Sequence, residues 1–371
     1  MTGRIQVMIV DDSASARAAL KRLLAADDDI EVFATAGDPF EAAEAMRSQL
    51  PDVLILDLAL PRMDGLTFLR RIMAQHPMPV VVCSGFTASG SANAMRALES
   101  GAAEVIAKPQ LATKEDWAEA EVRLCDAVRA AASTGGRRRA QRPAPRAMSP
   151  GPKLTADVIL PPRPPNPDVG PPGGHIIAIG ASTGGTEALT KLLTKLPAAL
   201  PPIVIVQHMP EHFTRTFAQR LDGLCELQVL EAQTGDRPAP GTVLIAPGNH
   251  HMLLRRSGPG YKVDIVKGAY VSRHRPSVDV LFRSVAQAAG KKAFGLIMTG
   301  MGDDGARGLL EMRQAGAETL VQDEATSVVF GMPKEALAMG GADRARPLGK
   351  LPLDIQTWAS QLAPRGAISW G

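Results

Sequence analysis

Two series of short aliphatic runs, each run followed by an amphipathic stretch, constrain the fold of this 371-residue chain more than any other feature. In residues 1–132 the aliphatic runs are IQVMIV, IEVFAT, VLILD, PVVVC and AEVIA, and the stretches between them have helical spacing. Continuous aliphatic runs that alternate with helices are typical of parallel strands buried on both faces of a sheet. The pattern therefore predicts an α/β fold with a five-stranded, doubly wound parallel sheet.

The second series begins at His175, after a segment of very different composition. Residues 133–172 are rich in proline and contain Gly135-Gly136 and three consecutive arginines from Arg137. Such a segment cannot bury a core, so we expect an extended, mobile linker. In residues 173–371, HIIAIG, PIVIVQ and AFGLIMTG predict strands of a second doubly wound, Rossmann-like α/β domain. TVLIAP, HHMLLRR and YKVDIV read as half-buried strands and predict a small antiparallel addition.

Composition and charge argue against several functional classes. Hydrophobic residues make up 45% of the chain, which is enough material for two cores. The net charge of +3 and the lack of a helix-turn-helix pattern argue against nucleic-acid binding. The 3 cysteines form no CxxC pair, which argues against a disulfide framework or a zinc site. No apolar stretch is long enough to span a bilayer, and the N-terminus lacks a signal-peptide pattern, so we expect a cytoplasmic protein.

Polar residues of the first domain stand at the points where its predicted strands end. Asp11 and Asp12 follow the first strand, Asp57 ends the third, Ser84 ends the fourth and Lys108 follows the fifth. Because the carboxyl ends of parallel strands meet at one edge of a sheet, we expect these side chains to lie close together. Clustered carboxylates call for a hard cation such as Mg²⁺, while a hydroxyl and an ammonium group can hold a phosphoryl group. Helix capping explains any one of these residues, but not all of them on the same edge.

This set of motifs resembles the receiver domains of response regulators. The matching segments are DD after the first strand, LDLALPRMDGL around the third and KP after the fifth, and the resemblance covers nearly all of residues 5–130. It implies the flavodoxin-like (βα)5 fold and a phosphoryl group accepted by Asp57 from a histidine kinase. It also implies a Mg²⁺ ion held by Asp12, Asp57 and the Ala59 carbonyl, with help from Asp11.

The resemblance also assigns residues that sense the phosphoryl group. Ser84 and Lys108 would have this role. Many receivers carry an aromatic switch residue three positions before this lysine, and this chain has Val105 there. We therefore expect the signal to pass through a different packing change.

The second domain contains a glycine-rich turn between a strand and a helix, in IIAIGASTGGTEAL. Residues 180–184 fit G-x-S-x-G, in which small neighbours expose a serine nucleophile, Ser182, beside helix N-terminal amides. Such a turn can instead cradle a dinucleotide, but that needs G-x-G-x-x-G, and Ser182 occupies the second glycine position. It also needs an acid after the next strand, where this chain has Gln207 and His208. A purely structural turn is the other alternative, so the nucleophile needs partners.

A serine nucleophile needs a base, and the base needs a carboxylate that orients it. His208 ends the strand expected beside the nucleophile strand, and Asp303 and Asp304 lie in another strand-turn-helix segment, GLIMTGMGDDGARG. An α/β-hydrolase has the chain order Ser, acid, His and would use Asp264 and His274 instead. A solvated strand face explains Asp264 better than that role does. We expect surface imidazoles at three further histidines, His212, His250 and His251.

The second domain resembles the catalytic domain of CheB, the family of chemotaxis-receptor protein-glutamate methylesterases. The shared segments are GASTGG, QHMP, APGNHHM, RHRPSVDVLF, TGMGDDG and FGMPKEA, between about residue 176 and residue 341. A receiver (1–132), a linker (133–172) and a catalytic domain (173–371) in series are also that family's architecture. By motif, the resemblance implies Ser182 as nucleophile, His208 as general base and Asp304 as the orienting carboxylate.

The resemblance implies roles for further residues and for partners. The Met301 amide would contribute to the oxyanion hole, Thr183 would line the site and His274 would lie beside the substrate. The implied function is a phosphorylation-activated hydrolase that demethylates glutamyl methyl esters, and deamidates glutamines, on cytoplasmic helices of chemoreceptors for sensory adaptation in bacterial chemotaxis. The partners would be methyl-accepting chemoreceptors and a CheA-type histidine kinase, with contact to the membrane only through the receptors.

The sequence also leads to an expectation about cofactors and leaves three alternative functions open. The resemblance implies Mg²⁺ for receiver phosphorylation and no cofactor in the hydrolase site. A receiver-controlled binding module is the first alternative, and failure to label Ser182 would favour it. A dinucleotide-dependent oxidoreductase is the second, and dinucleotide binding would favour that. A transcription factor is the third, but residues 175–371 contain no basic recognition helix.

Overall fold

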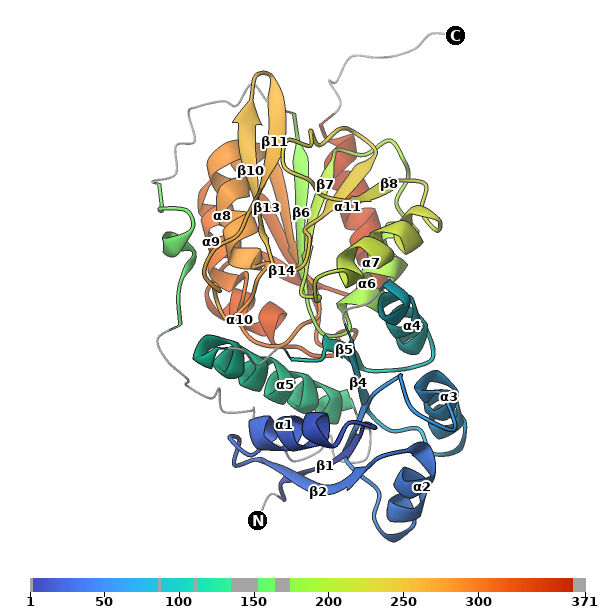
Figure 1. Ribbon diagram of the computed structural model, residues 1–371. Helices are drawn as coiled ribbons and strands as arrows, with labels where there is room; N and C mark the ends of the chain where they lie inside the picture. Colours follow the sequence, from blue (N-terminus) through green and yellow to red (C-terminus); the bar gives the residue numbers. More distant parts are fainter. Residues whose placement is uncertain (1–2, 86–87, 110–112, 135–152, 164–173, 363–371) are drawn as a thin grey trace. The chain divides into compact units, whose positions relative to one another are not determined.

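The computed structural model describes residues 3–85, 88–109, 113–134, 153–163 and 174–362 (Figure 1). These residues form two compact units, one built on a five-stranded sheet and the other on a seven-stranded sheet. Every strand pair within these two sheets is parallel. The predicted α/β class is therefore confirmed for both halves of the chain.

The N-terminal unit has the predicted (βα)5 fold, with the strand order β2-β1-β3-β4-β5. Its strands are β1 (Ile5–Val10), β2 (Ile30–Ala36), β3 (Val53–Leu56), β4 (Val80–Ser84) and β5 (Glu104–Ala107). Its helices are α1 (Ala14–Leu24), α2 (Pro39–Ser48), α3 (Gly65–Gln75), α4 (Ala88–Glu99) and α5 (Lys114–Thr134). In Figure 1, α1 and α5 lie on one side of the sheet and α2, α3 and α4 lie on the other.

Helices on both faces explain why the central strands are continuous aliphatic runs. All residues of β3 and β4 are buried, and so are most of those of β1. Ser13, Asp38 and Asp64 cap α1, α2 and α3 by accepting hydrogen bonds from backbone amides of the first turn. The strand order reverses between β1 and β3, and ligands of such sheets bind at the carboxyl ends of the strands at this switch point.

The second unit has the strand order β14-β13-β12-β6-β7-β9-β8. The strands are β6 (Ile176–Ala181), β7 (Ile203–Gln207), β8 (Gln228–Glu231), β9 (Thr242–Ile245), β12 (Ala293–Ile297), β13 (Glu318–Gln322) and β14 (Arg344–Arg346). From β6 the chain first builds outward through β7 and then returns to add β12 on the other side of β6. The switch point of this sheet therefore lies at β6 and β12.

Helices cover both faces of the seven-stranded sheet. They are α6 (Gly185–Leu193), α7 (Phe213–Asp222), α8 (Val278–Ala289), α9 (Ala306–Gln314), α10 (Met332–Ala338) and α11 (Leu351–Ser360), with short 3₁₀ turns η2 (Gly290–Lys292) and η3 (Leu348–Lys350). In Figure 1, α8 and α9 lie on one side of the sheet, and α6, α7 and α11 lie on the other. Of the helices in the described ranges, none combines the length and the apolar character needed to cross a bilayer.

The antiparallel addition is a hairpin that covers α8. It consists of β10 (His251–Ser257) and β11 (Gly260–Val266), which pair antiparallel. Every residue of α8 except Gln287 is buried, because the helix is enclosed by the sheet, α9 and the hairpin.

The strands predicted for the second unit were partly wrong and partly incomplete. TVLIAP was expected in the antiparallel meander, but it forms β9, which pairs parallel with β7 and β8. Residues 243–245 of β9 are all buried, as expected of an inner strand rather than of a half-exposed one. Strands β8, β13 and β14 of the seven-stranded sheet were not predicted.

The prediction for the linker was wrong over residues 153–163. This stretch forms a 3₁₀ turn, η1 (Ala156–Val158), and packs on the second unit. Ala156 and Leu160 are 2% and 4% exposed, so the stretch does bury apolar side chains. The rest of the expected linker, including its arginine cluster, lies outside the described residues apart from the end of α5.

Candidate functional site

Strand ends at the switch point of the seven-stranded sheet bring three predicted site residues to one edge. Ser182 follows β6 and His208 follows β7, and the register pairs Ala181 with Gln207 immediately before them. Asp304 lies between β12 and α9, on the other side of β6. A hydroxyl, an imidazole and a carboxylate therefore stand at the same carboxyl edge.

The turn that carries Ser182 is held through its backbone. The Ser182 amide donates to the Thr299 carbonyl (3.0 Å), and the Ser182 carbonyl accepts from the Gly185 amide (2.7 Å) and from Gln207 Nε2 (3.0 Å). Thr299 Oγ1 also donates to the Thr183 carbonyl (2.9 Å), which fixes the next peptide. Ser182 lies three residues before Gly185, the first residue of α6, whose N-terminal amides carry a partial positive charge. The position of Ser182 is thus set without the use of its own hydroxyl.

His208 contacts Asp304 through one of its two ring nitrogens. Nε2 lies 2.8 Å from Asp304 Oδ2, and Asp304 is fully buried. His208 Nδ1 is also buried, and no group among the described residues forms a hydrogen bond with it. Because an ionised carboxylate only accepts hydrogen bonds, Nε2 carries the proton in the neutral ring and Nδ1 keeps its lone pair. The ring is thus arranged as a base that acts through Nδ1.

Asp304 is also bound to the N-terminus of α8. Its Oδ1 accepts from Ser277 Oγ (2.8 Å) and from the Asp279 amide (3.0 Å), and its Oδ2 accepts from the Val278 amide (2.8 Å). Burial raises the pKa of this carboxyl group, but the hydrogen bond and the charge of His208 lower it by more, and so the pKa lies below its usual range. The carboxylate is therefore ionised and caps α8 while it orients His208.

His274 lies on top of His208, with ring centroids 3.7 Å apart and ring planes at 15°. The loop between β11 and α8 carries it. Thr183 follows Ser182 and is 4% exposed, and the partly buried Met301 lies between β12 and α9. No acceptor for the Met301 amide occurs in the described parts of the chain. These three residues therefore border the same strand ends as Ser182 and His208.

The alternative acid for an α/β-hydrolase, Asp264, is engaged elsewhere. It lies on β11, within 3.3 Å of Arg255 Nε and 3.4 Å of Lys262 Nζ. These are partly exposed ion pairs on the hairpin, which agrees with the solvated strand face expected for Asp264. The geometry therefore favours Asp304 as the acid that orients an imidazole.

His251 was expected at the surface, and this expectation was wrong. The residue is fully buried at the start of β10, where its Nε2 lies 2.9 Å from the Ala269 carbonyl and its Nδ1 accepts from the Ser277 amide (3.2 Å). Burial lowers the pKa of this imidazole. A neutral His251 that donates through Nε2 satisfies both contacts, so this side chain supports the start of α8.

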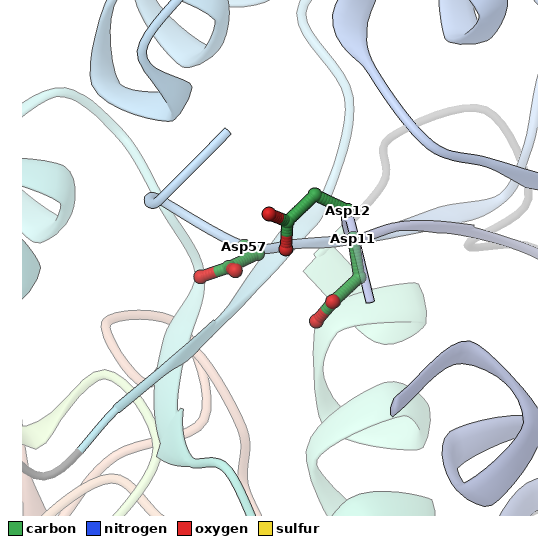
Figure 2. Close-up of side chains that lie close together, drawn as sticks. All are labelled: Asp11, Asp12 and Asp57. Carbon is green, nitrogen blue, oxygen red and sulfur yellow. The ribbon is translucent and has the colours of Figure 1, made fainter. Parts of the chain in front are cut away.

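A second group of predicted site residues lies at the carboxyl edge of the five-stranded sheet (Figure 2). Asp11 and Asp12 follow β1 and Asp57 follows β3, and each offers a carboxylate oxygen within 4.8 Å of the others. Asp11 and Asp57 are buried, whereas Asp12 is exposed. Gly65, at the start of α3, packs so closely on this edge that a Cβ there would lie 2.3 Å from the Asp57 carbonyl.

Lys108 and Ser84 belong to the same edge. Lys108 Nζ lies 2.8 Å from Asp11 Oδ2 and 2.6 Å from Asp57 Oδ2. Burial lowers the pKa of the Lys108 ammonium, but the hydrogen bonds to the two carboxylates raise it by more, so the group stays charged. Ser84 is buried, and its carbonyl accepts from the Lys108 amide (2.8 Å). Val105, at the position where an aromatic switch residue was sought, is 8% exposed on β5.

The donor set of this edge fits a divalent cation. Three carboxylates and one ammonium leave a formal charge of −2, which a divalent ion would balance. Carboxylate oxygens are the ligands of hard cations, and Mg²⁺ binds through one or two of them together with phosphate oxygens. Asp12 and Asp57 would hold the ion, while Lys108 keeps its contact with Asp11.

Several residues that hold these sites were not predicted from the sequence. The polar ones bind a backbone group or a site carboxylate with their side chains, and the glycines leave room where two segments touch. They are Gln207, Ser277, Asp279, Thr299, Gly300 and Gly65. The signal for Gln207 was its place at the end of an otherwise aliphatic strand, where a polar group must find a buried partner.

Comparisons with known proteins also divide the chain into a receiver part and a catalytic part. Residues 177–355 match the CheB methylesterase family, and residues 7–115 match the response regulator receiver domain. The protein-glutamate methylesterase/protein-glutamine glutaminase 5 of Anaeromyxobacter dehalogenans is 57% identical over 352 residues, which cover 95% of this chain and 96% of the relative. The corresponding protein 2 of Rhodospirillum rubrum is 56% identical over 367 residues, which cover 96% and 98%.

Among solved structures, the CheB methylesterase catalytic domain of Thermotoga maritima is 38% identical, with a TM-score of 0.49, and the match covers 50% of this chain and 99% of that domain. The sequence identity to the curated relatives extends over nearly the whole length of both chains. The chain therefore belongs to the family of protein-glutamate methylesterases/protein-glutamine glutaminases that carry a response regulator receiver domain.

Proposed function

We propose that Ser182 performs the hydrolysis typical of this family, with His208 as general base and Asp304 as the carboxylate that orients it. One observation carries this proposal. His208 Nε2 lies 2.8 Å from Asp304, and Nδ1 is left without a partner among the described residues, at the strand end next to Ser182. A base that is held through one nitrogen and open at the other is what a serine nucleophile requires.

In this mechanism Ser182 Oγ attacks the carbonyl carbon of a glutamyl methyl ester, and His208 Nδ1 takes the hydroxyl proton. The ionised Asp304 stabilises the imidazolium that forms. The Met301 amide and the amides at the start of α6 stabilise the tetrahedral oxyanion, while Thr183 and His274 line the substrate side. His208 then protonates the leaving methoxide, which departs as methanol. Water, deprotonated by His208, hydrolyses the acyl-enzyme, and His208 returns the proton to Ser182 Oγ. A glutamine side chain reacts alike and releases ammonia.

The substrates we propose are glutamyl methyl esters and glutamines on cytoplasmic helices of methyl-accepting chemoreceptors. Hydrolysis of either group leaves a carboxylate, so each turnover adds one negative charge to the receptor helix. This change of charge would reset receptor signalling during bacterial chemotaxis. The enzyme would act in the cytoplasm and approach the membrane only through its receptors.

The receiver unit would regulate this activity through Asp57. A CheA-type histidine kinase would donate the phosphoryl group, and Ser84 and Lys108 would bind its oxygens. Mg²⁺ held by Asp12 and Asp57 would neutralise part of the phosphoryl charge. Lys108 now pairs with Asp57, so a phosphoryl group on this carboxylate would change the charge that the lysine meets.

The direct test is release of methanol from methylated receptors by the full chain, with and without a small phosphodonor. We expect slow release without the phosphodonor and a rise of roughly 5- to 150-fold with it, the usual range for coupling between two sites. Absence of methanol release under both conditions would contradict the proposed activity.

Replacing Asp57 with asparagine is expected to remove the response to the phosphodonor. The amide cannot form the acyl phosphate, so the rate with phosphodonor should equal the rate without it. Radiolabelled phosphate incorporation and methanol release would be measured on the same preparation. The matched control is Asp28→Asn, an exposed aspartate in the loop between α1 and β2, which should respond like the wild type. A full response in Asp57→Asn would move the phosphoacceptor elsewhere.

Replacing Gly300 with alanine is expected to displace the nucleophile. A Cβ at this position would lie 2.4 Å from Met332 Sδ and 2.7 Å from Ser182 Cβ. Because small misplacements of reacting groups are costly, we expect kcat to fall by about 10- to 100-fold, and the free energy of unfolding to fall by about 1–3 kcal/mol. Gly349→Ala is the control, since nothing lies within 4 Å of its new Cβ. Wild-type kcat in Gly300→Ala would show that this contact does not set the position of Ser182.

A further inference from the structure

The loop that carries His274 has an unfavourable backbone. Val271 and His274 exchange backbone hydrogen bonds (3.1 and 2.9 Å), so Ser272 and Arg273 form a two-residue turn between them. Their φ angles are 51° and 68°. Turns with positive φ at both central residues favour Asn-Gly, and residues with larger side chains seldom adopt them. The Ser-Arg sequence therefore does not specify this turn, which must be stabilised from outside.

Residues 154–161 of the linker supply that support. The Leu154 carbonyl accepts a hydrogen bond from the Ser272 amide (2.9 Å), inside the turn itself. Ala156 and Leu160, both buried, pack in one cluster with Val271, the residue that opens the turn. The same cluster contains Leu253 of β10 and Val280 of α8. The linker stretch thus touches the turn through one backbone hydrogen bond and one apolar contact surface.

The linker stretch is in turn anchored to α8. Arg283, 2% exposed, binds the Asp157 carboxylate and donates to the Leu160 carbonyl (3.0 Å). One turn further along α8, Gln287 Nε2 donates to the Pro161 carbonyl (2.9 Å). A guanidinium that binds a carboxylate and a backbone carbonyl fixes both partners in direction as well as in distance. The stretch is therefore bound to α8 within η1, at Asp157, and just after it, at Leu160 and Pro161.

The loop is also bound to α8 by a contact that does not involve the linker. Ser272 Oγ donates to Asp279 Oδ2 (2.8 Å), and Asp279 Oδ1 accepts from the Gly308 amide (2.8 Å). This contact holds the side chain of Ser272. Its amide, in contrast, depends on Leu154, so loss of the linker would release the backbone of the turn.

We propose that residues 154–161 are a positioning element of the hydrolase site, which keeps His274 stacked on His208. The proposal rests on the proposed function, because it assigns the catalytic base to His208. A parallel ring 3.7 Å away limits rotation of the His208 imidazole. It thereby favours the orientation in which Nε2 meets Asp304 and Nδ1 stays open toward the nucleophile. Residues 154–161 would thus be part of the enzyme's active structure.

The test compares two aspartate substitutions within residues 154–161, each made in the full chain. Leu160 is 4% exposed, whereas Val158 is 51% exposed. We expect Leu160→Asp to detach residues 154–161 and to lower kcat by about 10- to 100-fold, the effect of a misplaced reacting group. Val158→Asp adds the same charge but should leave kcat and amide exchange at wild-type values. Leu160→Met, which keeps the volume and apolar character of the side chain, should have the kcat of the wild type.

Hydrogen exchange separates this idea from the catalytic proposal. In Leu160→Asp, the amides of residues 154–161 and 268–274 should exchange faster, while those of β6 and β12 keep their protection. Unchanged exchange in residues 268–274 would overturn the positioning role whatever the activity is. Activity that survives in Ser182→Ala would instead overturn the proposed function and leave the exchange result intact.

A double-mutant cycle then asks whether the linker acts through His274. In a His274→Ala background, Leu160→Asp should change kcat by less than about 2-fold, because the ring that the linker positions is absent. The same fold-loss in both backgrounds would show that the linker acts only on general stability, and would overturn the inference.

Discussion

Replacing Ser182 with alanine is expected to reduce methanol release by roughly 10⁴-fold or more, since removal of a serine nucleophile eliminates the covalent pathway. The fold should remain intact. The bonds that hold the turn use the Ser182 amide and carbonyl, and these remain in alanine. Methanol release from methylated receptors, with the phosphodonor present, is the measurement.

Two controls and a labelling experiment show whether the loss of activity is specific to the Ser182 hydroxyl. Ser360→Ala makes the same change at an exposed residue at the end of α11 and should leave the rate unchanged. Phosphate incorporation at Asp57 should be the same in Ser182→Ala as in the wild type, because the substitution leaves Asp11, Asp57 and Lys108 unchanged. A serine-directed phosphonate should label the wild type at Ser182 and fail to label the variant. Residual activity above about 1% of wild type would contradict the assignment, given the size of effect that such variants show.

Much of both sites could be predicted because parallel sheets align the ends of their strands. Residues that are far apart in the chain, such as His208 and Asp304, were expected together from their positions after neighbouring strands, and they lie 2.8 Å apart. The same reasoning applies to Asp11, Asp57 and Lys108. Aliphatic runs that alternate with helical spacing predicted all five strands of the first sheet but only β6, β7 and β12 of the second. They were recognised because strands buried on both faces of a parallel sheet are continuous aliphatic runs.

Strand neighbours in the second unit were harder to predict. The runs that form β9 and β10 are separated by a few residues and have similar composition, yet β9 is an inner strand of the parallel sheet and β10 belongs to the hairpin. What separates them is the pairing partner, and pairing depends on contacts distant in sequence. Local propensity carries little of that information.

The buried roles of His251 and of the linker were missed for a related reason. His251 is neutral and satisfied by two backbone groups, Ala269 and Ser277, that no local pattern connects to it. The linker composition predicts disorder, but a stretch of a few residues needs only a preformed apolar surface to dock. The docking surface for Ala156 and Leu160 is made by β10, the 271 loop and α8, all more than 90 residues further along the chain.

Replacing Asp304 with asparagine is expected to lower kcat by about 10³- to 10⁴-fold, because the change disturbs the tautomer of His208. In the wild type, Oδ2 accepts from His208 Nε2 and from the Val278 amide. An amide NH₂ at that position would donate to Nε2 and drive the ring proton to Nδ1, the nitrogen that must accept from Ser182. Placed the other way, the NH₂ would face Ser277 Oγ and the Asp279 amide, both of which now donate to Oδ1.

The same substitution is expected to change stability in a pH-dependent way. Asp304 has a pKa lowered to about 2 in the folded chain, so its carboxylate stabilises the fold fully above the unfolded-state pKa of about 3.9. This contribution is lost progressively as the pH falls from that value to the folded-state pKa. Asp304→Asn should therefore have a lower free energy of unfolding than the wild type near neutral pH, by about 1–3 kcal/mol for the buried donors left unpaired. The difference should shrink as the pH falls below about 4.

The matched control for both effects is Asp303→Asn, the same change one residue earlier, at a partly buried side chain. It should keep kcat within about 3-fold of wild type and lower the unfolding free energy by less than Asp304→Asn does, because His208 Nε2 contacts Asp304. Urea unfolding between pH 3 and 7, together with kcat at neutral pH, would be measured for both variants. Equal losses in the two variants would mean that the pair of aspartates acts through local charge, and the specific contact between Asp304 and His208 would then not be what activates the base.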